Sequence, residues 1–267
     1  MTSAGGASLF NSTKASLNAF QAYHGGDYEG MVSQLTNLDP DTFITEVRED
    51  DINLVHHCTI SGNFEALQAL STLPYFSHII NDNSNEAGWT PLLSACAAQE
   101  SRSDMRLVKL LVENGADVLM AKKDDGLAPI HFAASNNDLH LIDYIFSQVA
   151  EPARVSNTIN HQGWTAAHFA AFLGRFDAMN MLIENGANLS MKSDIGATPI
   201  ENVILNDNHV LLEALWPHAK NVKRDLNVEG TLGLIHIAAG HSKGSNTLRF
   251  LLEKCKISPN QLDNNIE

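Results

Sequence analysis

Small and apolar residues recur along the chain in a two-part pattern. In one copy, residues 168–171 (His-Phe-Ala-Ala) come before Gly174, and an apolar stripe of Ala178, Met179, Met181 and Leu182 follows at helical spacing. The first part predicts a short helix whose alanines allow close approach, and the glycine suits a turn. The stripe predicts a second helix with one apolar face. We therefore expect a helix-turn-helix unit that recurs along the chain.

A glycine-led motif marks the start of each unit. Gly88, Gly126, Gly163 and Gly196 are 38, 37 and 33 residues apart, and each opens a run in which Thr or Ala is followed by Pro or Ala. Threonine accepts hydrogen bonds from the free N–H groups of a helix start, and proline at the first helical position loses nothing there. The motif therefore predicts where the first helix of each unit begins.

The second helix of a unit ends in an Asn-Gly-Ala loop, at residues 114–116 and 185–187. Glycine adopts the left-handed conformation of such an end at the least cost. One helix pair buries too little surface to offset its ordering entropy, so neighbouring pairs must stack into a continuous core. The sequence therefore predicts an all-α solenoid of about seven helix-turn-helix repeats joined by hairpin loops.

The Gly-x-Thr-Pro-x-His signature and the Asn-Gly-Ala-Asp loop resemble the ankyrin-repeat family. The resemblance implies a disordered N-terminal tail at 1–17, an ankyrin-repeat domain at 18–263 and a C-terminal end at 264–267. The expected units are 18–48, 49–83, 86–121, 124–160, 161–193, 194–228 and 229–263.

Within this family the chain resembles the gankyrin-like chaperones of proteasome assembly. The similarity rests on residues 22–26 in the first unit and 86–91 in the third. Two long loops, at 98–104 and 147–160, and Glu201 at a histidine position depart from the pattern. The resemblance implies a proteasomal ATPase subunit as the partner.

Charge narrows the choice of partner. Asp and Glu number 31 against 17 Lys and Arg, a net charge of −14, and residues 124–216 carry 11 acidic and three basic side chains. So acidic a protein repels phosphate backbones, which excludes non-specific nucleic-acid binding and favours a basic protein surface. The sequence contains no signal peptide and no apolar run of roughly 18 residues, so we expect no membrane partner. Three widely spaced cysteines fit neither a disulfide framework nor a zinc site, so we expect a reducing compartment, the cytoplasm or the nucleus. We also expect a monomer.

The recurring histidines are the main candidates for chemistry. His56, His131, His168 and His236 each occupy the same repeat position, one repeat apart. A shared metal would need all its ligands about 2 Å from one ion. We instead predict that hydrogen bonds to its own and the neighbouring hairpin fix each ring. No local Ser-His-Asp, Cys-His or phosphate-loop motif occurs, so we expect neither an enzyme nor a cofactor.

The ankyrin resemblance places the partner surface on the concave side, at the hairpin tips and the exposed positions of the first helices. Large hydrophobic residues at such positions are typical of interfaces, where aromatic anchors carry most of the binding energy. We predict that Trp164 and Phe172 form the centre of the contact; the alternative is that they pack across adjacent repeats. The full predicted contact set is Trp89, Asp124, Asp125, Leu127, His161, Trp164, Phe172 and Leu173.

Two functions fit these observations. The first is a non-catalytic scaffold or assembly chaperone that binds a folded, basic protein surface. The alternative is the N-terminal targeting domain of a larger enzyme or channel, because residues 261–267 resemble the hairpin that opens a further unit. The mass of the natural protein would separate the two.

Overall fold

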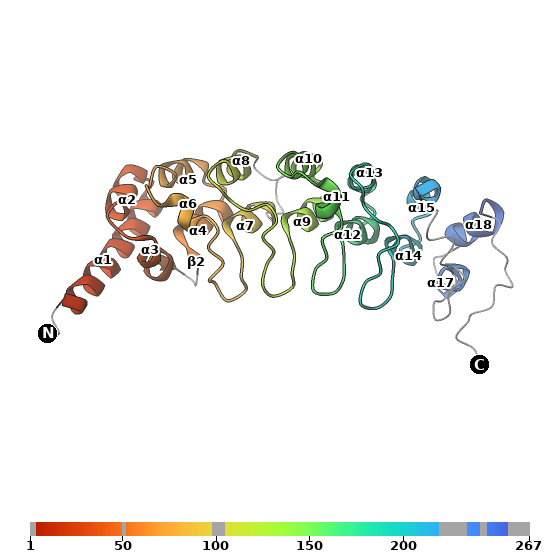
Figure 1. The fold of residues 1–267 in the computed structure, drawn as a ribbon, viewed down its shortest axis with the longest axis horizontal. Coiled ribbons are helices and arrows are strands. Elements are labelled where there is room, and N and C mark those ends of the chain that lie inside the picture. Colours follow the sequence, from red (N-terminus) through yellow and green to blue (C-terminus); the bar gives the residue numbers. More distant parts are fainter. Residues whose placement is uncertain (1–3, 50–51, 98–104, 219–233, 241–244, 256–267) are drawn as a thin grey trace. The chain divides into compact units, whose positions relative to one another are not determined.

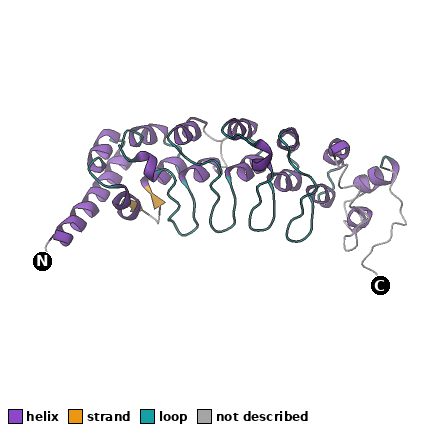
Figure 2. Ribbon diagram, viewed as in Figure 1, coloured by secondary structure: helices purple, strands orange, loops and turns teal. Residues whose placement is uncertain are grey.

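The computed structural model describes residues 4–49, 52–97, 105–218, 234–240 and 245–255. Nearly all the regular structure in these ranges is helical (Figure 2), and the predicted all-α class is confirmed. The chain divides into two compact units, residues 1–129 and 130–267. In both, helices form successive pairs joined by turns and hairpin loops (Figure 1).

The first unit has an inner and an outer layer of helices. The inner α4 packs against α7, and the outer α5 packs against both α2 and α8. A two-residue antiparallel ladder, with Arg48 opposite Asn53, leads into α4. The elements are α1 (Ala4–Gly25), α2 (Tyr28–Leu35), α3 (Pro40–Glu46), β1 (Arg48–Glu49), β2 (Ile52–Asn53), α4 (Leu54–Ile60), α5 (Phe64–Leu70), α6 (Phe76–Ile79), α7 (Pro91–Ala97) and α8 (Met105–Glu113).

Helix α1 corrects the expectation of a disordered tail over residues 1–17, because the helix already begins at Ala4. Its second half is anchored in the core: Ala19, Phe20 and Tyr23 are buried, and the Ser16 hydroxyl donates to the Glu46 carbonyl at 2.9 Å. Residues 4–17 contain no proline, the residue that most strongly breaks a helix, so an anchored helix can continue towards the N-terminus through Gly5 and Gly6.

The second unit repeats the two-layer arrangement. Inner helix α14 packs against α12 and α17, while outer pairs form between α10 and α13 and between α15 and α18. The elements are α9 (Pro129–Asn136), α10 (Leu139–Ser147), α11 (Pro152–Ser156), α12 (Ala166–Phe172), α13 (Phe176–Glu184), α14 (Pro199–Leu205), α15 (His209–Leu215), the 3-10 turn η1 (Trp216–His218), α17 (Leu234–Gly240) and α18 (Ser245–Glu253).

Of the two segments predicted to be long loops, the structure describes one. The segment 147–160 contains the short helix α11, which starts at a proline. The segment 98–104 lies outside the described residues, as do the predicted C-terminal end at 264–267 and the hairpin expected at 261–267. The boundaries of the seven predicted repeats stay a prediction.

The local signals at the helix ends are confirmed. Thr165 and Thr198 each cap a helix in a reciprocal box, in which the side chain three residues later accepts from the backbone N–H of the cap residue. That partner is His168 in one unit and Glu201 in the other, so the glutamate performs the histidine's capping role. At the other end, Gly186 has φ +85°, the left-handed conformation that the Asn-Gly pair predicts.

Candidate protein-binding site

The hairpin of Trp164 is closed by the side chain and backbone of one asparagine. Asn160 donates its N–H to the Trp164 carbonyl at 2.9 Å, and its side-chain Oδ1 accepts from the N–H groups of Trp164 at 2.8 Å and Gln162 at 3.0 Å. Asn160 is itself buried. The backbone that carries the indole is therefore fixed before any partner arrives.

The indole of Trp164 packs on the aromatic side chains of α12. Its ring centroid lies 5.0 Å from that of Phe169, 5.6 Å from that of Phe172 and 6.0 Å from that of His168. Phe172 nevertheless remains 48% exposed and the adjacent Leu173 43% exposed. The structure thus brings Trp164 and Phe172 into one cluster, whose inner side packs within the repeat and whose outer side faces solvent.

His168 has the structural role that the sequence predicts. Its Nε2 donates to the Ala197 carbonyl of the next hairpin at 3.0 Å, and its Nδ1 accepts from the backbone N–H of Thr165 at 3.1 Å. Burial lowers the pKa of His168, which favours the neutral ring that this arrangement needs. His131 likewise contacts the Thr158 carbonyl through Nε2 at 3.1 Å.

In the first unit the equivalent histidine holds the hairpin of Trp89. His56 Nε2 lies 3.0 Å from the Trp89 carbonyl oxygen. Asn85 brackets the same peptide group, since its Oδ1 accepts from the Trp89 N–H at 2.8 Å and its Nδ2 donates to the Trp89 carbonyl at 2.6 Å. Burial lowers the pKa of His56, although the hydrogen bond to Trp89 and the charge of Asp82 oppose the shift. Trp89 is therefore held by two buried side chains.

Lys122 is a site residue that sequence reasoning missed. Its Nζ lies 5.0 Å from the centroid of the Trp89 ring and 2.9 Å from Oδ2 of Asp125. Asp125 also accepts from the Leu127 N–H at 3.1 Å. The acidic side chain thus closes its own hairpin and balances Lys122. The spacing of three residues between Lys122 and Asp125 was a signal in the sequence, but contact with Trp89 depends on the preceding hairpin.

The remaining predicted contact residues lie on the hairpins. Asp124 and His161 are exposed, and Leu127 is partly buried. Trp89, Asp124, Asp125 and Leu127 belong to the first unit, whereas His161, Trp164, Phe172 and Leu173 belong to the second. Their role in partner contact stays a prediction.

Among the residues that the structure describes, no three His, Cys, Asp or Glu side chains gather where they could hold a metal ion. None of the described helices has the length and apolar character needed to cross a lipid bilayer. What the described residues do form is a series of helix pairs joined by turns and hairpin loops.

Comparison with known proteins gives the same class. Residues 96–193 match the family of ankyrin repeats, in three copies. The chain is 28% identical over 142 residues to a probable 26S proteasome regulatory subunit, p28, of Saccharomyces cerevisiae, covering 53% of this chain and 60% of that protein. It is 26% identical over 197 residues to the B-cell lymphoma 3 protein homolog of Mus musculus, covering 73% and 42%. The human BCL-6 corepressor-like protein 1 is 28% identical over 127 residues, covering 48% and 7%.

Residues 96–193 therefore contain ankyrin repeats, as the signature motifs of the chain predict, and repeats of this family imply protein–protein interaction. In each of these three similarities the chain spans less than two thirds of the relative's own length.

Proposed function

We propose that this protein is a non-catalytic scaffold that binds a folded, basic protein surface through its hairpins and inner helices. The observation that carries the proposal is the cluster of Trp164 and Phe172. Phe172 keeps almost half of its surface exposed on a fixed inner helix. Exposed aromatic groups on a rigid support are favourable anchors, because little conformational entropy is lost when a partner covers them.

Charge supports a basic partner. Acidic side chains outnumber basic ones by 14 over the whole chain and by 8 between residues 124 and 216. Opposite charge on the partner would steer the encounter and raise the association rate. We also place the protein in the cytoplasm or nucleus, where its free cysteines, such as the buried Cys58, stay reduced.

The first partner to test comes from the similarity to a probable proteasome regulatory subunit of yeast. We propose a proteasomal ATPase subunit, and an assembly-chaperone role for this chain. Each ATPase subunit of a regulatory particle would be purified and its binding to this protein measured by biolayer interferometry. Absence of binding to every subunit would reject the proteasomal partner and leave the scaffold role in place.

The binding surface is tested with Phe172→Ala. We expect binding to weaken by about 2 kcal/mol, as for an interface anchor, while folding stability changes by less than about 1 kcal/mol because half of the ring is exposed. Val210→Ala is the control, since Val210 is an exposed apolar residue of outer helix α15. Equal effects of the two variants on binding would contradict the assignment.

The charge argument has its own measurement. The association rate should fall when salt rises from about 0.15 M to about 1 M, because the Debye length shortens from about 8 Å to about 3 Å. An association rate independent of salt would show that the acidic charge does not steer the partner.

A further inference from the structure

The hairpins of Trp89 and Trp164 share the sequence Gly-Trp-Thr, but the side chains that follow them differ. In the second unit, the residues five and eight positions after the tryptophan are Phe169 and Phe172, and both rings contact the Trp164 indole. In the first unit, the residues at the same two positions are Ser94 and Ala97. Two small side chains thus stand where the second unit has two phenyl rings.

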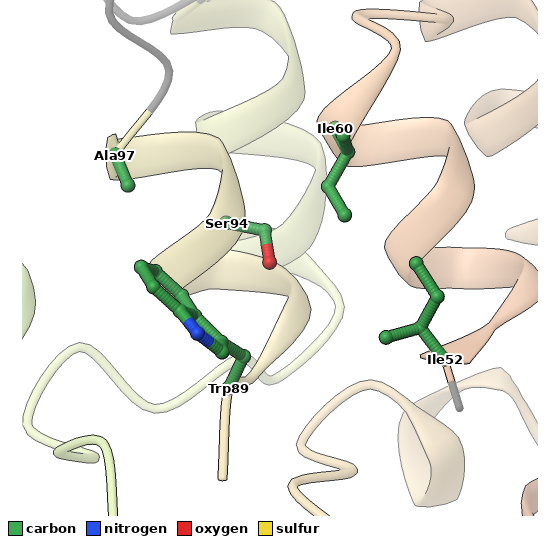
Figure 3. A pocket seen from close by; sticks show the side chains of 5 residues that line it. All are labelled: Ile52, Ile60, Trp89, Ser94 and Ala97. Carbon is green, nitrogen blue, oxygen red and sulfur yellow. The ribbon is translucent and has the colours of Figure 1, made fainter. Parts of the chain in front are cut away.

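The first unit has an open pocket at this place. It has a volume of about 270 Å³ and is lined by Ile52, Ile60, Trp89, Ser94 and Ala97. Figure 3 shows Trp89, Ser94 and Ala97 on one side of this Trp89 pocket and the two isoleucines on the other. A dry cavity of about 150 Å³ is enough to bind benzene. The Trp89 pocket therefore has room for a phenyl or indole group.

The wall of the Trp89 pocket is held in place without a ligand. Asn85 and His56 fix the backbone of Trp89 through the hydrogen bonds described above. The Lys122 ammonium group lies over the indole ring. A group that docks here meets a surface already in position, so that ordering the receptor costs little.

Charge indicates what surrounds the docking group. The first unit holds 17 acidic and seven basic residues, a net charge of −10. Glu49 is paired in register with Ile52 on the hairpin, and Glu86 lies three residues before Trp89; both glutamates are exposed. Lys122, the cation beside the pocket, is balanced by Asp125. An apolar group flanked by positive charge complements these surroundings.

We propose that the Trp89 pocket binds one aromatic side chain of a partner protein, in a segment where Lys or Arg flanks that side chain. The bound ring would take the place that Phe169 and Phe172 fill beside Trp164. This inference rests on the proposed scaffold function, but it concerns the Trp89 hairpin of the first unit instead of the Trp164 and Phe172 cluster of the second.

The test uses synthetic peptides and the whole protein. One peptide set has Phe or Trp at the centre and Lys or Arg on both sides; a second has Ala at the centre, and a third has Glu on both sides. Nuclear magnetic resonance of the indole N–H groups reports three separate places, at Trp89, Trp164 and Trp216, and single Trp→Phe variants assign the signals. We expect the first set to shift the Trp89 signal and to bind at least tenfold more tightly than the other two.

Ala97→Phe tests the pocket by filling it. The substitution copies the residue at the equivalent position of the second unit, so we expect a folded protein that binds the first peptide set at least tenfold more weakly. Ala150→Phe is the matched control, because Ala150 is exposed between α10 and α11; it should leave binding unchanged. If Ala97→Phe fails to fold, Ile60→Lys replaces it, since Ile60 is 58% exposed and a lysine there repels a basic peptide.

Three results would overturn the inference: no shift of the Trp89 signal at millimolar peptide, equal binding of the Glu-flanked set, or unchanged binding by the filled variant. The failure of the proposed function looks different. In that case the Trp89 signal responds to peptide, while Phe172→Ala leaves binding of the whole partner protein intact. A shift confined to the Trp164 signal would reject the Trp89 pocket and support the surface in the second unit.

Discussion

The Trp89 hairpin of the first unit and the Trp164 hairpin of the second have the same motif and different surroundings. In both, a buried asparagine four residues before the tryptophan accepts its N–H, through Asn85 at 2.8 Å and Asn160 at 2.8 Å. The Trp164 ring then packs against phenyl rings, whereas the Trp89 ring faces a cation and a pocket. A shared motif therefore fixes the backbone of a hairpin and leaves its binding chemistry to residues further along.

The largest expected difference between the two hairpins is in folding stability. Trp164→Ala should destabilise the protein by about 2 to 3 kcal/mol, because the indole contacts three rings and is partly buried. Trp89→Ala should cost about 1 kcal/mol, since its ring borders open space and a cation. Urea denaturation followed by circular dichroism measures both. Equal losses would mean that the two environments are energetically alike.

A smaller loss of stability is expected when the positive charge beside Trp89 is removed. Lys122→Met keeps the apolar stem but removes both the charge over the indole and the ion pair with Asp125, and we expect a loss of about 0.5 to 1 kcal/mol in unfolding free energy. Lys123→Met is the control, because Lys123 is exposed and donates to the Asn83 carbonyl instead of covering a ring. If the control variant loses as much as Lys122→Met, the contact with the indole contributes nothing specific.

The smallest expected difference concerns pH and the two buried histidines. Burial lowers the pKa of His168 in the folded state. As the pH drops below the pKa of the unfolded chain, about 6.5, the unfolded chain therefore binds more protons than the folded one, and the free energy of unfolding decreases. Protonation would also remove the Nδ1 acceptor for the Thr165 N–H. His168→Gln should therefore reduce the loss of stability between about pH 7.5 and about pH 5.

His56→Gln should change this pH dependence less. Both nitrogens of His56 face oxygen atoms, Asn53 Oδ1 at 2.9 Å and the Trp89 carbonyl at 3.0 Å, to which a protonated ring can donate. The charge of Asp82 also favours protonation, against the effects of burial, Arg48 and His57. Unfolding free energies of both variants across the same pH range make the comparison. A larger change in His56→Gln would reverse the assignment.

Much of the fold could be predicted because its signals are local. A threonine cap and its partner lie three residues apart, as in Thr198 and Glu201, and the glycine of an Asn-Gly pair ends its own helix. Helix α1 could not be predicted in the same way. Its first residues lack an apolar stripe, and its helical state follows from anchoring further along, at Phe20 and Tyr23.

The candidate site, too, was predictable only in part. The sequence alone identified Trp164 and Phe172 as unusual at their positions, and the repeat spacing alone assigned His168 a structural role. The sequence could not show that Asp125 forms an ion pair with Lys122, nor that the indole of Trp164 contacts Phe172. Both contacts depend on the direction in which the side chains point.

The sequence by itself determined the repeat class and the signals at several helix ends, such as the Thr198 cap and the Gly186 turn, since these depend on backbone preferences within a few residues. Only the tertiary structure decided what each tryptophan faces. His56 reaches the Trp89 carbonyl across 33 residues, and Lys122 covers the Trp89 ring from the next hairpin. Whether the space beside a tryptophan is filled or open depends on the combined volume of the side chains around it. These side chains come from different repeats and meet only when the repeats pack.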